Sequence, residues 1–178
     1  MVAIDRAPPG AALAELKAFL RIETSLEDAL LTGLLLAATE SVEALLGQLL
    51  FERPVAERGV LSDRGLPLAA GPVRSLVSVE TIGTDGMLSV VPDDGARLLI
   101  GAHGEGRIDA PELPEGVGVQ VRYRAGLAGD WNGVPEVLRL CVIRTAAHFH
   151  THRDAPDDPG IPPAVPRMLG PWRVRRIR

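Results

Sequence analysis

The sequence has very little of several residue types. Among its 178 residues are one cysteine, one lysine and six aromatic residues. A single cysteine, Cys141, excludes an intramolecular disulfide framework and a metal cluster held by several cysteines. The longest run without a charged residue covers 11 residues, 29–39, well short of the roughly 20 that a membrane span needs. Residues 1–10 contain Asp5 and lack the apolar segment of a signal peptide. We therefore expect a soluble protein that is made in the cytosol and has no membrane contact.

Patterns typical of metal sites are also scarce. His148, His150 and His152 stand close together, and the first and last are four residues apart, so on a helix they share a face as zinc ligands can. No third ligand is evident, and histidines near the C-terminus of a helix also interact favourably with its dipole. Cys141 falls on the apolar stripe of a predicted helix, where a free cysteine behaves as a small hydrophobic residue. We therefore expect neither a metal ion nor a cofactor.

The glycine-rich and acidic stretches have the composition of turns. Residues 101–106 (GAHGEG) lack the Gly-Lys-Ser/Thr ending of a phosphate-binding loop, and no serine lies in a Gly-x-Ser-x-Gly elbow. The paired acids at 93–94 and 157–158 are flanked by proline and glycine, which is typical of turns and not of a catalytic dyad. The sequence therefore predicts a protein that is not an enzyme.

The charge that is present is divided unevenly along the chain. The net charge is −4, yet five arginines follow Pro159 with no acid among them, and the first 158 residues hold 14 basic and 23 acidic residues, a sum of −9. An acidic body does not suit a general nucleic-acid binder, which carries positive charge over its folded surface. The basic end suits a tail that docks on an acidic partner such as another protein. A solvated, unattached terminus is the alternative.

Glycine and proline divide the chain into regions. Residues 11–46 contain one glycine and no proline, residues 47–135 contain 15 glycines and 7 prolines, and residues 136–155 contain neither. Because both residue types break helices, the predicted fold class is α+β. It comprises a small bundle of three main helices, an inserted antiparallel β-rich subdomain and an extended C-terminal arm. The expected boundaries are residues 1–50 and 134–155 for the bundle, 51–133 for the insert and 156–178 for the arm.

The first and third helices are bounded by proline and glycine. The first spans about residues 11–20, where leucines and a phenylalanine recur at helical spacing. The third follows Pro135, which fits the first position of a helix, and ends near residues 152–155. Gly47 suits the left-handed position after the last turn of the second helix.

The second predicted helix is apolar on more than one side. It begins at Ser25, a favoured N-cap residue with Asp28 three positions on. Beyond one apolar stripe, Leu31, Leu35 and Leu46 extend the apolar character onto a second face. Such a helix is buried by more than one neighbour, so it lies centrally in a bundle or meets another subunit. These three leucines are the candidate subunit-interface residues.

The middle of the chain is predicted to form short strands. Thr84-Asp85-Gly86 and Asp93-Asp94-Gly95 each suit a hairpin turn, and residues 118–123 alternate apolar and polar as a half-buried strand does. The candidate strands are residues 54–61, 76–82, 87–91, 96–100 and 117–124. Short strands with regular turns indicate a small antiparallel sandwich or barrel, whose topology stays open.

The C-terminal residues combine a stiff stretch with an apolar and basic one. Residues 161–166 (IPPAVP) favour polyproline II, and residues 168–178 (MLGPWRVRRIR) place Trp172 among arginines. Met, Trp and Arg are enriched at interface cores and hot spots. The pattern predicts an arm that inserts into a partner; an arm folded back on its own domain is the alternative. The candidate arm residues are Pro162, Pro163, Val165, Pro166, Met168, Leu169, Pro171, Trp172, Arg173, Arg175 and Arg176.

Several segments together resemble a known family. Residues 15–22 (ELKAFLRI) and 27–50 (EDALLTGLLLAATESVEALLGQLL) are similar to the opening of the head–tail connector (adaptor) proteins of long-tailed bacteriophages. Residues 121–154 (VRYRAGLAGDWNGVPEVLRLCVIRTAAHFHTHRD) resemble the family's later block, where a strand ends in a Tyr-x-Ala-Gly turn and Val-Pro opens the last long helix. Residues 165–176 (VPRMLGPWRVRR) are similar to its terminal segment. Connectors of this kind also occur in phage-derived gene transfer agents, and the arginine-rich, lysine-poor composition suits a GC-rich genome.

The resemblance implies a structural role at the head–tail junction of a virion or phage-like particle, for a protein made in the bacterial cytoplasm. It implies a homo-oligomeric ring of twelve copies, with the portal protein on one side and a tail-side connector or stopper protein on the other. Genome DNA would pass through the central channel without sequence-specific binding, and an acidic lumen would let it slide. The C-terminal arm would dock on the portal, and neither catalysis nor a cofactor is implied.

A monomeric binding module is the alternative. In that case the β-rich middle would bind a peptide or a nucleic acid, and strong, salt-sensitive DNA affinity of the isolated body would favour it.

Overall fold

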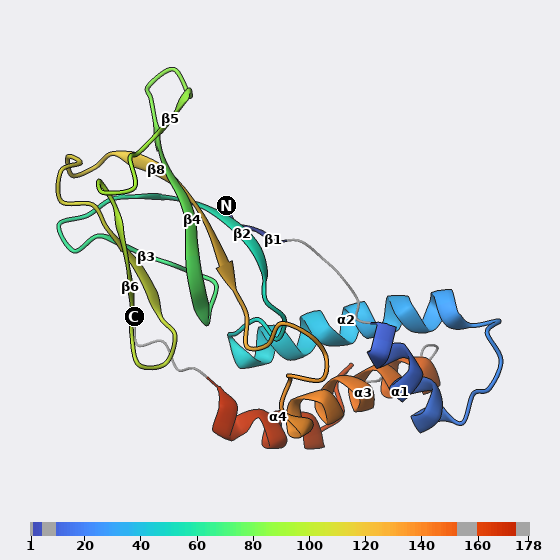
Figure 1. Cartoon of the computed structure of the whole chain (residues 1–178). Helices are drawn as coiled ribbons and strands as arrows, with labels where there is room; N and C mark the ends of the chain where they lie inside the picture. Colours follow the sequence, from blue (N-terminus) through green and yellow to red (C-terminus); the bar gives the residue numbers. More distant parts are fainter. Residues whose placement is uncertain (1, 5–9, 153–159, 174–178) are drawn as a thin grey trace. The chain divides into compact units, whose positions relative to one another are not determined.

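The computed structural model describes residues 2–4, 10–152 and 160–173 of the chain. They form two compact units, each made of two separate segments (Figure 1). The β unit comprises Met1–Asp5 and Glu52–Leu127, and the helical unit comprises Arg6–Phe51 and Ala128–Arg178. In the sequence, most of the β unit is therefore an insertion between the two segments of the helical unit. The predicted α+β class is confirmed.

The β unit contains two antiparallel sheets. The larger has the strand order β1-β2-β8-β4-β5, with β1 (Val2–Ile4), β2 (Arg53–Val60), β8 (Gly118–Ala125), β4 (Val73–Ile82) and β5 (Leu88–Val90). The smaller has the order β3-β7-β6, with β3 (Leu66–Pro67), β7 (Gly106–Asp109) and β6 (Arg97–Ile100). β8 pairs with β2 and β4 along its whole length, so it is the central strand of the larger sheet.

The core of the β unit is built from alternate residues of the central strands. Val119, Val121 and Tyr123 of β8 are fully buried, because alternate side chains of a strand point to one face. The two sheets approach closely at Gly59 of β2, where a Cβ atom would lie 2.5 Å from the Cδ1 atom of Leu66. A larger residue at this position would require the Leu66 side chain to shift.

All five predicted strands are confirmed, and three further short strands were not predicted. β4 and β5 form a hairpin around Asp85-Gly86, and β6 and β7 form one around residues 101–105. The hairpin predicted at Asp93-Asp94-Gly95 is wrong: the residues do turn, but they join β5 of one sheet to β6 of the other. β1, β3 and β7 have only two to four residues each, too few to show alternation, and β1 takes residues 2–4 out of the predicted bundle.

The helical unit is formed by α1 (Gly10–Leu20), α2 (Asp28–Leu46), α3 (Glu136–Thr151), α4 (Ala164–Leu169) and the 3₁₀ turn η1 (Gly170–Trp172). α2 packs against α1, α3 and α4. The side chains that close this core are fully or almost fully buried: Leu16, Leu31, Leu35, Val42, Leu46, Leu138, Ile143, Val165 and Leu169. By length and composition alone α2 is apolar enough to cross a membrane, a test that a core helix also passes.

The two ends of α2 differ from each other in how well they were predicted. The predicted N-cap at Ser25 is wrong, because the helix begins at Asp28 and no side chain caps its first turn. The Asp28 carboxylate instead accepts a hydrogen bond from Lys17 Nζ of α1 at 2.6 Å. Gly47 is left-handed as predicted, with φ 70°, and its N–H donates to the Glu43 carbonyl at 2.9 Å. A residue with a Cβ atom would be strained at this φ.

Candidate functional site

The C-terminal segment, residues 161–173, is folded onto the helical unit. The extended arm predicted for residues 156–178 is wrong here, because Ala164–Leu169 is the helix α4. Pro166 lies in its first turn, where no intrahelical N–H bond is lost. Val165 and Leu169, four residues apart, are completely buried on one face of α4. Burial of these two side chains explains why the segment leaves the extended form, as in the alternative of an arm folded back on its own domain.

Two polar contacts attach the end of this segment to the end of α2. Gln48 Nε2 donates to the Trp172 carbonyl at 2.8 Å, and Arg173 Nε donates to the Leu45 carbonyl at 2.7 Å. The carbonyls of the last helical turn have no partner inside the helix, and they attract cations. Arg173 therefore satisfies one of these carbonyls and ties residue 173 to α2.

The predicted arm residues separate into three groups. Val165 and Leu169 belong to the chain's own core, while Pro162, Pro166 and Met168 are half-buried. The outward-facing members, which remain available to a partner, are Pro163, Pro171, Trp172 and Arg173. Trp172 is 38% exposed, unusual for a side chain of this size. Arg175 and Arg176 lie outside the described residues.

The three candidate interface leucines lie in the core. Leu31, Leu35 and Leu46 are 0%, 2% and 1% exposed, because their face of α2 is covered by the other helices of the same unit. A contact with a second subunit would therefore have to come from other side chains of α2. The sequence pattern showed two apolar faces but could not show which of them the chain itself covers.

A cluster around Trp131 fixes the loop before α3, and sequence reasoning missed it. Trp131 Nε1 donates to Glu15 Oε2 of α1 at 2.6 Å, and its ring stacks on Phe51 with centroids 6.1 Å apart. The Arg139 guanidinium lies 6.0 Å from the ring centroid and pairs with Glu136. The hydrogen bond and charge of Arg139 hold the pKa of the Glu136 carboxyl below its usual value. The sequence signal that could have indicated this cluster was Trp131 itself, one of only six aromatic residues in the chain.

The histidines of α3 do not gather into a metal centre. The rings of His148 and His152 stack with centroids 4.1 Å apart, and His150 Nε2 lies 3.4 Å from Glu27 Oε2. Among residues 2–4, 10–152 and 160–173, no group of three His, Cys, Asp or Glu side chains is placed to hold a metal ion. Burial raises the pKa of the Cys141 thiol, which disfavours the nucleophilic thiolate.

The buried polar groups of the β unit form a network with a structural role. Glu57 Oε2 accepts hydrogen bonds from the Tyr123 hydroxyl at 2.8 Å and from the Ala69 N–H at 2.9 Å. The Tyr123 oxygen in turn accepts from the Ala70 N–H at 3.1 Å. These contacts attach the segment after β3 to the central strand β8.

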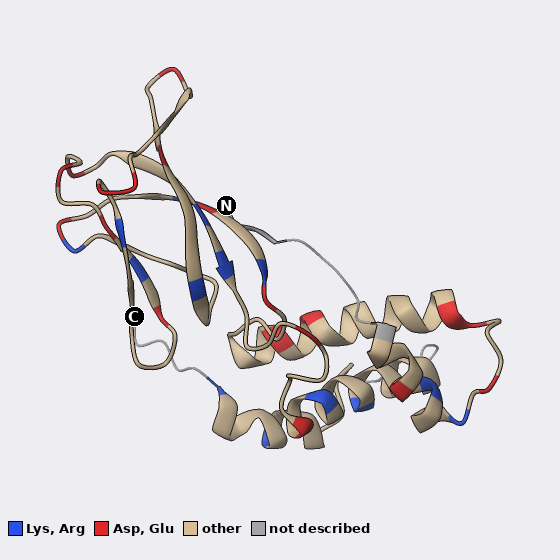
Figure 2. Cartoon of the chain, in the orientation of Figure 1, with Lys and Arg blue, Asp and Glu red and all other residues tan. Residues whose placement is uncertain are grey.

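The arginines on the outer face of the larger sheet are paired with carboxylates. Arg124 Nε lies 2.6 Å from Glu52 Oε1, and Arg122 Nε lies 3.7 Å from Glu80 Oε2. Gln120 bridges Arg58 to the same Glu80 carboxylate, at 2.8 and 2.7 Å. Figure 2 shows most of the basic residues of this unit on its strands and most of the acidic ones on its loops. The sheet face is therefore largely neutralised.

Comparisons with known proteins agree with this architecture. Residues 11–70 match the phage gp6-like head–tail connector protein family. No curated protein matches the chain significantly. Among solved structures, a chain from "Neck of empty GTA particle computed with C6 symmetry" is similar at a TM-score of 0.80 and 26% identity, covering 100% of this chain and 97% of that one. Chains from "Virion of native gene transfer agent (GTA) particle" and "Neck of native GTA particle computed with C12 symmetry" have TM-scores of 0.79 and 0.76 at the same identity and coverage.

The similarity to the neck structures extends over both units, since all of this chain is covered. The resemblance predicted from the sequence is therefore confirmed: the chain matches the phage head–tail connector family over residues 11–70 and has, along its whole length, the fold of a chain in the neck of a gene transfer agent particle.

Proposed function

We propose that this chain is a structural adaptor that forms a ring at the head–tail junction of a phage-like particle. The observation that carries the proposal is the full-length similarity to a chain in the neck of gene transfer agent particles, one of which was computed with C12 symmetry. The ring has twelve copies, lies between the portal and a tail-side connector or stopper protein, and surrounds a channel for DNA. The role needs binding surfaces and no reaction.

The charge of the chain suits this role. The first 158 residues sum to −9, and the arginines of β8 are paired with acids. DNA binding depends on unpaired basic side chains that neutralise phosphates. A ring of such subunits repels the passing genome where it lines the channel.

The outward part of the C-terminal segment, with the residues that follow it, docks on the portal. Trp172 and Arg173 are of the residue types that dominate interface energetics, and three further arginines lie in residues 174–178. Arg173 is attached to the C-terminal end of α2. Residues 174–178 span at most about 18 Å, so an acidic surface that meets their arginines lies close to that end of the helix.

Electron microscopy of the full chain bound to its portal protein tests the adaptor role. We expect a ring seated on the portal, with both proteins present in the same particle. A chain that stays monomeric after mixing and co-expression with the portal would overturn the proposal. A monomer in the absence of the portal is expected, because a ring can assemble on its template.

Portal docking is tested by substitutions that spare the core of the helical unit. Removing residues 162–178 would uncover the surface that Val165 and Leu169 bury, so the sharper variants are Trp172→Ala and deletion of residues 174–178. Each should weaken portal binding by tenfold or more. Arg167→Ala, on the exposed side of α4, is the matched control and should change binding about twofold or less, because one exposed charge contributes about 0–1 kcal/mol. Equal losses in all three would contradict the assignment.

The alternative function is a monomeric module that binds a peptide or nucleic acid. It is tested by measuring DNA binding of the full chain. The carboxylate pairing of Arg122 and Arg124 does not favour binding to phosphates. Salt-sensitive, tight binding of double-stranded DNA by the full chain would support this alternative against the adaptor.

A further inference from the structure

The larger sheet of the β unit ends in two open edges. Its strand order places β1 (Val2–Ile4) at one edge and β5 (Leu88–Val90) at the other. Among the strands that the structure describes, β1 pairs only with β2 and β5 pairs only with β4. An edge strand presents unbonded N–H and C=O groups on its outer side, and these groups can pair with a strand of another chain.

The hydrogen bonds of β5 show which of its backbone groups are free. The Val91 N–H donates to the Val79 carbonyl at 2.9 Å, so these two residues form a bonded pair. Bonded and non-bonded pairs alternate along antiparallel strands, and the register of β4 and β5 places Leu88 and Val90 in the non-bonded pairs. The backbone N–H and C=O groups of these two residues therefore point away from β4, toward the open edge.

Neither edge of the larger sheet carries the usual protection against pairing. Natural edge strands are often blocked by charged residues or by proline. Both edges of the smaller sheet fit this rule, with Pro67 in β3 and Arg97 in β6. β1 has the sequence VAI and β5 the sequence LSV, without a charge or a proline. The two edges of the larger sheet are therefore suited to pairing with a further strand.

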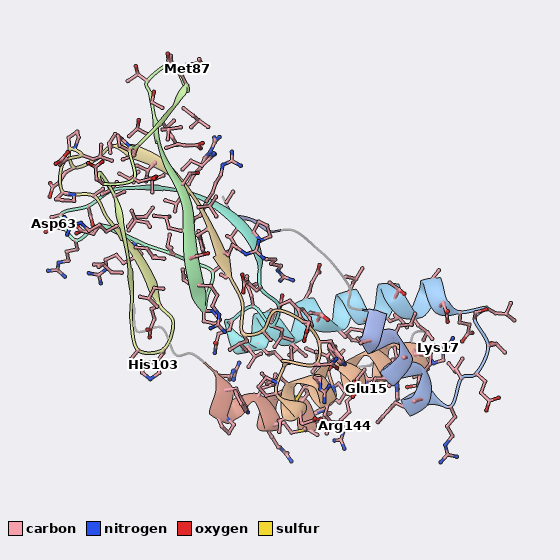
Figure 3. All side chains as sticks on the ribbon, in the orientation of Figure 1. Glu15, Lys17, Asp63, Met87, His103 and Arg144 are labelled. Carbon is pink, nitrogen blue, oxygen red and sulfur yellow. The ribbon has the colours of Figure 1, made fainter. Side chains whose placement is uncertain are left out.

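The side chains of β5 are also uncovered. Val90 is 73% exposed and Leu88 is 39% exposed, and Met87, just before the strand, is 68% exposed. In Figure 3, Met87 lies at the outer end of the β4–β5 hairpin, away from the other strands of the unit. Contiguous exposed apolar side chains mark an interaction site, and an open apolar edge strand is prone to aggregation. A partner strand would cover both the side chains and the edge.

The sheet itself indicates β1 of another copy as that partner. Four antiparallel pairings lead from β1 to β5, so the two strands run in the same direction, and each has three residues. They lie at opposite edges of one sheet. Successive copies in a ring of twelve are rotated by about 30°, so a head-to-tail contact needs two different surfaces on nearly opposite sides of the subunit. Pairing of β5 with β5 would join two copies about a twofold axis and would form no ring.

We propose that β5 of one copy pairs in parallel with β1 of the next copy, so that the larger sheets of neighbouring copies form one continuous sheet around the ring. This inference rests on the proposed ring and names one of its subunit contacts. Main-chain hydrogen bonds supply the attraction, as in other cases of strand addition to a sheet edge. The neighbouring copy covers the exposed side chains of Leu88 and Val90.

Two substitutions in β5 test the pairing in the full chain, assembled with its portal and counted as rings by electron microscopy. Leu88→Pro removes an N–H that makes no bond to β4, and Val90→Lys places a charge at the edge. Each should lower the yield of rings about tenfold or more and leave urea unfolding of the free chain unchanged. Leu99→Lys, at a position of β6 that is 50% exposed, is the matched control and should assemble to within about twofold of the wild type.

Val90→Lys decides the test if Leu88→Pro weakens the fold, because a lysine at position 90 removes no backbone group. A wild-type yield of rings from Val90→Lys would overturn the contact. A loss of rings from Leu99→Lys as large as that from Val90→Lys would overturn it as well, because the effect would then not be specific to the β5 edge.

A disulfide between copies tests the identity of the partner strand. The strand register places Ala3, through Ala56, and Val90, through Glu80, at equivalent positions of the pleat. After an oxidant is added to assembled rings, the double variant Ala3→Cys, Val90→Cys should give a ladder of linked copies on a non-reducing gel. Each single variant should remain monomeric, since Cys141 is buried.

Leu88→Cys in place of Val90→Cys covers the neighbouring register of the same contact. The absence of a ladder from both double variants would overturn the pairing of β5 with β1. Dimers formed by Val90→Cys alone would show that β5 pairs with β5 and would overturn it as well.

The wild-type chain separates the failure of this inference from the failure of the proposed function. Rings of wild-type protein together with unaffected variants would overturn only the strand pairing. The absence of rings with wild-type protein and portal would overturn the proposed function, and this inference with it.

Discussion

The two units hold themselves together in different ways. In the β unit, buried polar groups join segments that are far apart in the chain, as Glu57 does with Tyr123. In the helical unit, the buried hydroxyls of Thr39 and Thr145 donate only to the carbonyls four residues earlier, in their own helices. The long-range side-chain hydrogen bonds of the helical unit, such as that from Trp131 to Glu15, are only partly buried, and apolar side chains make up most of its buried core. We therefore expect the helical unit to be destabilised most by the loss of buried apolar side chains. The β unit should also be destabilised by the loss of a buried polar group.

The aromatic residues let each unit be followed separately. Trp131 and Trp172 are the only tryptophans of the chain and both belong to the helical unit, whereas its single tyrosine, Tyr123, belongs to the β unit. Tryptophan fluorescence therefore reports on the helical unit, and the tyrosine signal reports on the β unit. Urea unfolding followed by both signals is the readout for the predictions below.

The largest effect is expected from the apolar core of the helical unit. Leu35→Ala removes a side chain that is 2% exposed and should lower the free energy of unfolding by about 2–5 kcal/mol, through lost burial and the cavity left behind. The matched control is Leu30→Ala on the exposed side of the same helix, which should cost about 0.5 kcal/mol or less. Equal losses would show that the outward side of α2 is covered within the chain.

The next effect tests the polar network of the β unit. Glu57→Gln keeps the shape of the side chain but replaces an acceptor that serves the Tyr123 hydroxyl and the Ala69 N–H. We expect a loss of about 1–3 kcal/mol in the free energy of unfolding. Glu52→Gln is the control; its partner Arg124 is partly exposed, and about 0–1 kcal/mol is expected. If Glu57→Gln had the same free energy of unfolding as Glu52→Gln, the buried polar network would not stabilise the β unit, and the difference from the helical unit would disappear.

A smaller effect of opposite sign is expected on the outer side of α2. Gly33 lies inside a helix with open space around its Cβ position, so Gly33→Ala should raise the free energy of unfolding by about 0.5–1 kcal/mol. The gain arises mainly from the reduced conformational freedom of the unfolded chain. A loss on urea unfolding would mean that this position touches a part of the chain itself.

The smallest effect concerns the exposed pair at the start of α3. Arg139 lowers the pKa of the Glu136 carboxyl, so the pair stabilises the folded state at pH values above the usual carboxyl pKa. This contribution is lost as the pH falls through the lowered pKa. Thermal unfolding of Glu136→Gln should therefore show a slightly lower Tm at neutral pH and no difference in acid. A difference that persists in acid would point to a role other than the charge.

Much of the fold follows from local pattern. The spacing of leucines and the absence of glycine and proline predicted the main helices, and the turns at Asp85-Gly86 and Gly47 were predicted from residues that favour positive φ. The short strands β1 and β3 were not predictable, because two or three residues show no period. β1 and β3 form because each pairs with an edge of a longer strand, β1 with β2 and β3 with β7.

The candidate site was less predictable than the fold. The sequence marked Trp172 and its arginines as an unusual segment, but it could not show that Val165 and Leu169 would be buried against the neighbouring helices. It also missed Trp131, whose partner Glu15 lies 116 residues away. Contacts over such separations depend on the completed fold.

By itself the sequence determined the α+β class, the positions of the main helices, the acidic body with its basic end and the resemblance to head–tail connectors. Each of these depends on residue type and spacing along the chain. Only the tertiary structure decided that Leu31, Leu35 and Leu46 close the chain's own core, that residues 164–169 form a helix and that Leu30 stays outside. The reason is physical: which face of a helix is buried depends on neighbours that are distant in sequence, and no local pattern records which face they cover.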